Sequence, residues 1–233
     1  MRTTCCRAVQ SVLAIALVAA LASGALAQAG PITNLGDLKA TLQVYRSSGQ
    51  YEAELWAVAT DARRYLEERA AAGGKLAMVL DIDETSLSNW PALKVNDLGL
   101  IIPGACDLER GPCGFLSWAQ LARAEAIGPT LELYRAALAR GVAVFFITGR
   151  PESLREVTER NLRAAGYDRW AALILKPNDL KTVSAADFKA PSRRSIVEQG
   201  YTIIVNMGDQ PSDLSGGFAD RTFLLPNPFY RIP

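Results

Sequence analysis

The 233-residue chain contains no histidine. This absence excludes Ser-His-Asp and Cys-His catalysis, phosphohistidine intermediates, and zinc, copper or haem sites that use histidine ligands. The chain also has no excess of one charge, since 25 basic and 24 acidic residues give a formal net charge of +1. It therefore lacks the basic footprint that binds a nucleic-acid polymer. Any catalysis must rest on carboxylates, hydroxyls, Lys, Arg or a bound cofactor.

The first 27 residues have the layout of a secretory signal peptide. Arg2 and Arg7 make a positively charged start, an apolar run covers residues 12–21, and Ala25-Leu26-Ala27 places small residues at a cleavage site. Cleavage after Ala29 fits nearly as well. The alternative is an uncleaved membrane anchor, but the run is short for a span of about 20 residues. We therefore predict a signal peptide at residues 1–27 and an exported protein, periplasmic or secreted, without a membrane anchor.

Two of the four cysteines, Cys106 and Cys113, remain once the signal peptide is removed. The segment between them contains a Gly-Pro turn, so in an oxidising compartment this pair can close a small disulfide loop. Two free thiols are the alternative. A zinc site would need two further ligands, and no histidine is present to supply them.

Apolar runs and helical patterns alternate along the rest of the chain. Continuous apolar runs predict buried strands at residues 76–80, 142–147, 171–175, 201–205 and 221–225. Helical stretches are expected at residues 37–72 (with a break near residues 47–49), 130–139, 152–165 and 191–199. This alternation is typical of an α/β fold, here a Rossmann-like parallel sheet flanked by helices within a single domain at residues 28–233.

Residues 86–128 interrupt this alternation. They are rich in Trp, Pro, Gly and Cys, and they leave directly after the first predicted strand and return before the second. Ligand sites of α/β sheets lie at the carboxyl ends of the strands, so we expect this insertion to form a small cap there. An irregular surface loop without contact to the ligand is the alternative.

Acidic residues follow two of the predicted strands. Asp81 and Asp83 come after the first, and Asp209 and Asp213 come after the strand at residues 201–205. One carboxylate can act as a nucleophile while another exchanges a proton. A carboxylate that attacks a phosphate dianion needs a neutralising cation, usually Mg²⁺ with oxygen ligands, and adjacent strand ends can present Asp81 and Asp209 to one ion.

Donors for phosphate oxygens are also present in the chain. The strand at residues 142–147 is followed by the Thr148 hydroxyl and the Gly149 backbone N–H, and Lys189 precedes the strand at residues 201–205. An N–H at the start of a helix and a nearby cation suit a bound phosphate. Each of these residues is a weak signal when taken singly, and the stronger signal is their order along the alternating strands and helices.

Four sequence segments resemble the motifs of the haloacid dehalogenase superfamily. They are Asp81-x-Asp83-x-Thr85, Thr148-Gly149-Arg150, Lys189 and Gly208-Asp209-x-x-x-Asp213. With their flanking residues they resemble one subfamily, the acid phosphatases that include plant vegetative storage proteins and bacterial class C acid phosphatases. The resemblance extends from about residue 38 to the C-terminus.

The resemblance implies a role for each motif residue. Asp81 would attack phosphorus and form an aspartyl-phosphate, while Asp83 would protonate the leaving alcohol and then activate water. Thr148, Gly149 and Lys189 would hold the phosphoryl oxygens. The metal ligands implied for Mg²⁺ are the carboxylate of Asp81, the main-chain carbonyl of Asp83, Asp209, and Asp213 in the first or second ligand shell.

Two other functions use the same fold. One is a non-catalytic storage or phosphate-binding protein, which the intact Asp83 disfavours because binding alone does not need it. The other is phosphotransfer to an alcohol instead of water. The substrate expected is a phosphomonoester, with a preference for a nucleotide or an aromatic ester, because Trp90, Phe115 and Trp118 can supply an aromatic wall near the site.

Overall fold

The computed structural model describes residues 32–180 and 183–232. The predicted signal peptide at residues 1–27 lies outside them. Residues 35–232 belong to one unit of the chain, and it carries every element discussed below. Among the described residues, no helix has both the length and the apolar character that a membrane crossing requires.

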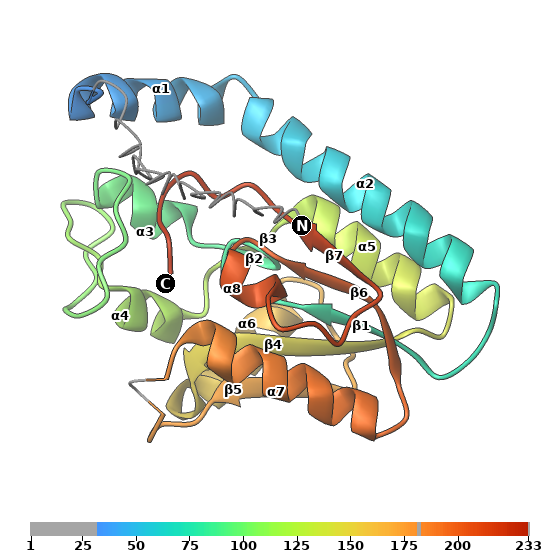
Figure 1. Cartoon of the computed structure of the whole chain (residues 1–233). Coiled ribbons are helices and arrows are strands. Elements are labelled where there is room, and N and C mark those ends of the chain that lie inside the picture. The colour runs from blue at the N-terminus through green and yellow to red at the C-terminus, as the bar shows by residue number, and fades with distance from the viewer. Residues whose placement is uncertain (1–31, 181–182, 233) are drawn as a thin grey trace, which may run out of the picture. The chain divides into compact units, whose positions relative to one another are not determined.

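Five parallel strands form the central sheet in the order β5-β4-β1-β6-β7 (Figure 1). Their bounds are Leu76–Leu80 for β1, Ala143–Pro151 for β4, Ala172–Lys176 for β5, Thr202–Gly208 for β6 and Arg221–Leu224 for β7. The α/β fold predicted from the sequence is confirmed. Strand β1 lies in the centre, between β4 and β6, so the carboxyl ends of these three strands are neighbours.

Strands β4 and β6 extend further than the apolar runs predicted. Thr148 pairs with Leu175 of β5, and Gly208 pairs with Leu224 of β7. These residues continue the ladder because a neighbouring strand supplies their backbone partners, which the apolar pattern of a single segment does not reveal. The extension fixes the backbone close to the polar residues that follow each strand.

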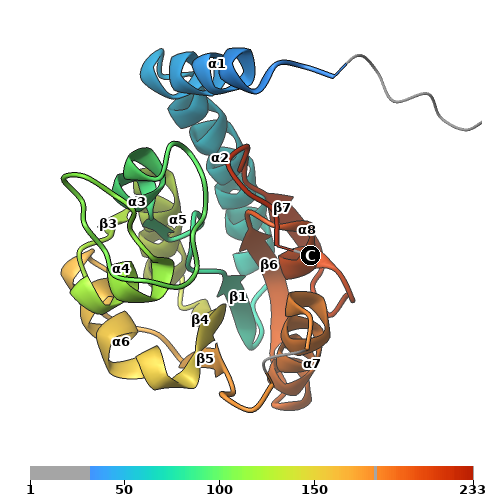
Figure 2. The same cartoon turned by 90° about the vertical axis from the view of Figure 1, so that its left-hand side faces the viewer.

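The alternating side chains of β1 divide the core into two layers. Met78 and Leu80 belong to a large cluster with α2 (Gln50–Ala70), α5 (Gly128–Ala139) and α6 (Arg155–Ala164). Ala77 and Val79 face a smaller cluster with α7 (Ala185–Glu198). Figure 2 shows helices on both sides of the sheet. Because both faces of β1 are covered, all five of its residues are apolar and buried.

Helix α7 begins at Ala185, six residues before the start predicted from the sequence. The side chain of Ser184 accepts a hydrogen bond from the Asp187 N–H and caps the helix. Pro191 therefore lies inside the helix, and the predicted start at residue 191 was wrong. Lys189 is consequently a helical residue whose side chain is buried.

The remaining helical elements agree with the predicted positions. The stretch at residues 37–72 forms α1 (Leu35–Ser47) and α2, and Gly49, with a φ of 83°, lies at the break between them. The stretch at residues 152–165 forms the 3-10 turn η1 (Glu152–Leu154) and α6. A short helix, α8 (Pro211–Leu214), follows β6.

Residues 87–126 form a small substructure between β1 and α5. It contains β2 (Leu87–Ser88), α3 (Trp90–Val95), α4 (Phe115–Leu121) and β3 (Glu125–Ala126), and the antiparallel pairing of β2 with β3 closes it (Figure 1). A disulfide joins Cys106 to Cys113. The chain leaves for this segment directly after the carboxyl end of β1, so the segment begins at the edge of the sheet where the acidic residues lie.

Candidate active site

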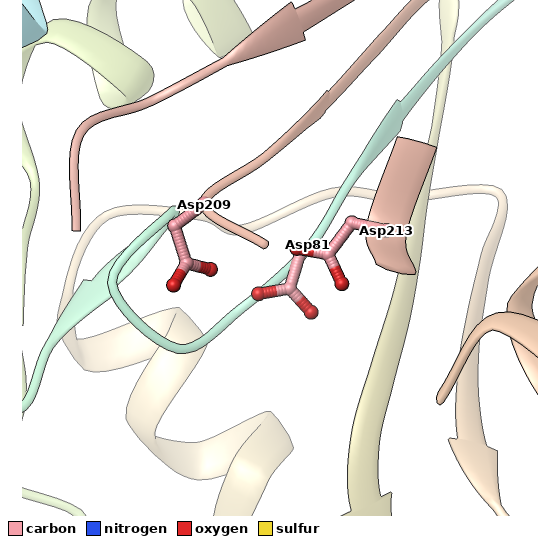
Figure 3. A group of neighbouring side chains, drawn as sticks. All are labelled: Asp81, Asp209 and Asp213. Carbon is pink, nitrogen blue, oxygen red and sulfur yellow. The ribbon is translucent and has the colours of Figure 1, made fainter. Parts of the chain in front are cut away.

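Three buried carboxylates meet at the carboxyl edge of the sheet. Asp81 follows β1, Asp209 follows β6 and Asp213 lies on α8, and one oxygen from each lies within 4.8 Å of the others (Figure 3). The Asp81 N–H donates to the carbonyl of Met207 at 3.0 Å, which holds the end of β1 against β6. The pairing of β1 with β6 therefore brings together acidic residues that are far apart in the sequence.

Lys189 is the cation of this cluster. Its Nζ donates to Asp81 Oδ1 at 2.5 Å and to Asp213 Oδ1 at 2.6 Å, and only 4% of the residue is exposed. Burial alone would lower the pKa of Lys189, but the carboxylates of Asp81 and Asp213 outweigh burial and raise it. Lys189 is therefore a fixed positive charge next to Asp81.

One lysine does not balance three carboxylates. Burial raises the pKa of Asp81 well above its usual value; Lys189 opposes this shift, and the neighbouring Asp213 and Asp209 add to it. Burial, followed by repulsion from Asp213, raises the pKa of Asp209 to about 7. A site of clustered oxygen ligands with excess negative charge suits a hard divalent cation, so these residues fit a metal ion of the Mg²⁺ type.

Asp213 is tightly fixed by its neighbours. Its Oδ1 accepts from Lys189, and its Oδ2 accepts from the Gln210 N–H at 2.9 Å. Gly208 passes so close that a Cβ atom there would lie 2.4 Å from the Cβ of Asp213. Only glycine fits at position 208, which explains the Gly-Asp pair that follows the apolar part of β6.

Asp83 stands outside the carboxylate cluster and pairs with Arg150. Arg150 Nη2 donates to Asp83 Oδ1 at 2.7 Å, and Asn89 Nδ2 donates to the same oxygen at 2.9 Å. Arg150 is buried, whereas 18% of the Asp83 side chain remains exposed. The sequence motif Thr148-Gly149-Arg150 includes Arg150, but no role was predicted for it. Its position directly after Thr148-Gly149 was the sequence feature that could have indicated a role at the site.

The two predicted phosphate-binding residues on β4 differ in position. Gly149 lines a cavity of about 170 Å³ together with Asp81, Asp83, Lys189 and Asp209. Thr148 is fully buried, and its Oγ1 accepts a hydrogen bond from the Arg150 N–H at 3.1 Å. The structure thus places Gly149 and Lys189 in the cavity lining, whereas Thr148 is not among the lining residues.

Part of the cavity lining is apolar. Its apolar lining residues are Leu100, Ile102, Phe115, Ala185 and Ile232. Of the three aromatic residues considered from the sequence, only Phe115 lines the cavity. Trp118 is buried and donates from Nε1 to Asn89 Oδ1 at 2.8 Å, and the ring of Trp90 packs against Phe229 with centroids 5.5 Å apart. Both tryptophans therefore contact other protein residues and do not line the cavity.

Sequence reasoning missed a second polar group at the site. Glu84 is buried with a φ of 52°, and burial raises its pKa to about 7. Tyr230 donates its hydroxyl proton to Glu84 Oε2 at 2.5 Å, and Asn227 Nδ2 donates to Asp209 Oδ2 at 2.7 Å. The only sequence signal for these C-terminal residues is a polar residue flanked by Pro226 and Pro228.

Residues 32–233 match the family model described as HAD superfamily, subfamily IIIB (Acid phosphatase). The chain belongs to this subfamily. Acid phosphatase 1 of Solanum lycopersicum is 36% identical over 184 residues, which cover 78% of this chain and 69% of the relative. Vegetative storage protein 1 of Arabidopsis thaliana is 34% identical over 189 residues, covering 80% and 67%. The family resemblance drawn from the four motifs is confirmed, and the chain is a phosphoric monoester hydrolase of the acid phosphatase type.

The fold of this acid phosphatase also resembles a solved structure. The class C acid phosphatase of Bacillus anthracis superposes with a TM-score of 0.66 at 22% identity, covering 84% of this chain and 86% of that one. A second structure of that protein has tungstate bound. At this identity the likeness supports the fold alone, which agrees with the parallel five-stranded sheet.

Proposed function

We propose that this chain is an exported, Mg²⁺-dependent acid phosphatase that hydrolyses phosphomonoesters through an aspartyl-phosphate on Asp81. The observation that carries the proposal is the position of Asp81. Asp81 lines the cavity, and its carboxylate accepts a hydrogen bond from Lys189. One of its oxygens lies within 4.8 Å of an oxygen of Asp209 and of Asp213, so the three carboxylates can bind one metal ion. A nucleophile next to a fixed cation and further oxygen ligands suits attack on a phosphate.

In the first step an Asp81 oxygen bonds to phosphorus while the bond from phosphorus to the ester oxygen breaks. Asp83 gives its proton to the leaving alcohol. Lys189 and Gly149 both line the cavity, so the lysine ammonium and the Gly149 backbone N–H can donate to the phosphoryl oxygens and stabilise their negative charge. In the second step a water oxygen bonds to phosphorus while Asp83 takes a proton from that water. The bond from phosphorus to the Asp81 oxygen breaks, which frees the Asp81 carboxylate and inorganic phosphate.

Asp81, the main-chain carbonyl of Asp83 and Asp209 would hold the Mg²⁺ ion. Asp213 would lie in the first or second ligand shell of the ion, and its Oδ1 accepts from Lys189, which holds Lys189 next to Asp81. When bound, Mg²⁺ supplies the positive charge that reduces repulsion between the carboxylate and the phosphate dianion. Thr148 would fix the backbone that presents the Gly149 N–H, since its hydroxyl accepts from the N–H of Arg150, on the far side of Gly149.

The substrate class proposed is an aromatic phosphomonoester or a nucleotide. Support comes from the apolar residues that line the cavity, among them Leu100, Ile102 and the aromatic Phe115. A flat ring gains free energy by packing against such a wall. Phe115→Ala should raise KM for an aryl phosphate and leave KM for a sugar phosphate nearly unchanged. Faster turnover of sugar phosphates than of every aryl ester and nucleotide would refute this preference.

The decisive experiment assays an aryl phosphate with the purified chain, with Mg²⁺ and after removal of metal by a chelator. Asp81→Asn should lower kcat by about four to six orders of magnitude, as loss of a nucleophile commonly does. Asp179→Asn changes an exposed carboxylate outside the site and serves as the matched control. Full activity of Asp81→Asn, or activity that is indifferent to the chelator, rejects the mechanism.

The same assay separates the alternatives. A storage or phosphate-binding protein would bind inorganic phosphate without turnover of any ester. A phosphotransferase would form glycerol phosphate when glycerol is added, so the ratio of the two products measures its share. Export is tested by N-terminal sequencing of the protein recovered outside the cytoplasm. The expected first residue is Gln28, or Gly30 if cleavage follows Ala29.

A further inference from the structure

The C-terminal segment returns to the carboxylate cluster. After β7 the Leu225 N–H donates to the carbonyl of Gly208 at 2.9 Å, which continues the pairing with β6. The chain then passes α8 on its way to the C-terminus (Figure 2), and Tyr230 and Ile232 line the cavity. The segment at residues 225–232 is therefore part of the site, although the mechanism above gives it no task.

The segment touches Asp209, an expected metal ligand. Asp209 Oδ2 accepts two hydrogen bonds, from Gln210 Nε2 at 2.6 Å and from Asn227 Nδ2 at 2.7 Å. Asp209 Oδ1 accepts one, from Thr85 Oγ1 at 3.2 Å. A carboxylate oxygen has about two lone-pair sites, so Oδ2 is filled and Oδ1 keeps capacity for a cation. The donors thus select which oxygen serves as the ligand.

The orientation of the Asn227 amide is itself fixed. Its Oδ1 accepts hydrogen bonds from the N–H groups of Phe229 at 3.0 Å and Tyr230 at 3.4 Å. Because the oxygen end faces these two donors, the amide NH₂ end must face Asp209. Asn227 therefore acts as a donor toward Asp209 and cannot exchange its two ends without losing all three bonds.

Further contacts hold the segment in place. The ring of Phe229 packs against Tyr51 and Trp90, with centroid separations of 5.7 and 5.5 Å. Tyr230 bonds Glu84, and the Ile232 N–H donates to Gln210 Oε1 at 3.0 Å. These contacts follow Asn227 in the chain and the bond from Leu225 to Gly208 precedes it, so the backbone is held on both sides of Asn227.

We infer that Asn227 is a positioning residue that orients the Asp209 carboxylate for the metal ion. The inference rests on the proposed Mg²⁺ dependence. Residues that hydrogen-bond a metal ligand orient it, and their loss typically weakens metal binding by about 10- to 100-fold. A neutral amide suits this task, because it donates to Asp209 without adding a positive charge that would compete with the ion.

The test measures the Mg²⁺ dissociation constant of the full chain by isothermal titration calorimetry. Asn227→Ala should raise the Kd by about 10-fold or more, and saturating Mg²⁺ should restore most of kcat. Asn227→Asp keeps the oxygen that accepts from residues 229 and 230 but replaces the donor with a negative charge. Near-ultraviolet circular dichroism verifies that each variant is folded.

Phe229→Leu is the matched control. It reduces the packing of the segment on Tyr51 and Trp90 and leaves the three donors of Asp209 in place, so the Kd should stay within about threefold of the wild-type value. Wild-type Kd in both folded Asn227 variants overturns the inference. A Kd raised equally by Phe229→Leu also overturns it, since docking of the whole segment would then matter instead of the amide. If the wild-type chain itself binds no Mg²⁺, the proposed function fails and the inference with it.

Discussion

The buried guanidinium of Arg150 holds both carboxylate oxygens of Asp83. Nη2 donates to Oδ1 at 2.7 Å, and Nε donates to Oδ2 at 3.1 Å. This fork is rigid and bidentate, so it fixes the plane of the carboxylate as well as its position. The Asp83 side chain nonetheless remains partly exposed toward the cavity, as a group that exchanges protons with substrate and water must be.

Arg150→Met should therefore lower kcat by about 100-fold with little change in KM, since a misplaced general acid loses the typical advantage of positioned proton transfer. Arg150→Lys keeps the charge without the fork and should recover only part of the activity. Arg135→Met, which removes an exposed arginine of α5, is the control. Wild-type kcat in Arg150→Met would show that Asp83 does not depend on this pair.

Lys189→Met leaves Asp81 and Asp213 buried without their shared cation. Removal of one partner of a buried ion pair costs about 3–5 kcal/mol of the free energy of unfolding. We expect that loss in urea unfolding of the metal-free variant. Saturating Mg²⁺ should reduce it, because the ion brings positive charge to the same carboxylates. An unchanged urea midpoint without metal would contradict the assigned role of Lys189.

The metal-free chain should become less stable as the pH rises from about 4 to about 7. Asp209 has a pKa of about 7 in the folded chain, against an ordinary value of 3.8. A raised carboxyl pKa means that the carboxyl group loses its proton less readily in the folded chain than in the unfolded chain. The protonated group therefore adds its full stabilisation at a pH below the ordinary pKa, and this stabilisation is lost as the pH rises through the pKa of the folded chain. Glu84, with a pKa of about 7, acts in the same direction.

Over the same interval Mg²⁺ should stabilise the chain increasingly, because the ion needs the ionised form of Asp209. Thermal unfolding at a series of pH values, with and without Mg²⁺, measures both trends. Asp209→Asn should flatten both trends, and the part of the metal-free trend that remains would come from Asp81 and Glu84, whose pKa values are also raised. A metal-free chain that gains stability across this interval would contradict the assignment.

Loss of the Cys106–Cys113 disulfide should lower stability and loosen the cavity wall. The bond closes a loop with a sequence separation of 7, for which the loop-entropy model gives at most about 2–3 kcal/mol. The backbone next to the loop also holds Phe115, whose N–H donates to the carbonyl of Ile101 at 2.7 Å. The double variant Cys106→Ser/Cys113→Ser should therefore melt at a lower temperature and show a higher KM for aryl phosphates. Identical melting of the variant and the wild type would show that the loop needs no covalent link.

Local patterns of the sequence predict the alternating strands and helices, the break near Gly49 and the carboxylates at the strand ends. These features depend on residues that are close in sequence. Apolar runs form buried strands, glycine permits a left-handed turn, and polar residues follow the ends of the strands. The start of α7 was misplaced by the same reasoning, because Pro191 is a weaker boundary than the cap that Ser184 forms with Asp187. Trp90 and Trp118 likewise look like ligand contacts in the sequence but pack as supporting residues.

By itself the sequence determined the fold class, the family and the acidic residues from which a phosphatase site can be built. Tertiary structure alone decided that β1 lies between β4 and β6, which brings Asp81 next to Asp209 and places Arg150 against Asp83. It also decided that Asn227 returns to Asp209. The physical reason is that a buried carboxylate requires donors, and residues from distant segments meet that requirement only when packing brings them together, which no local pattern of the chain encodes.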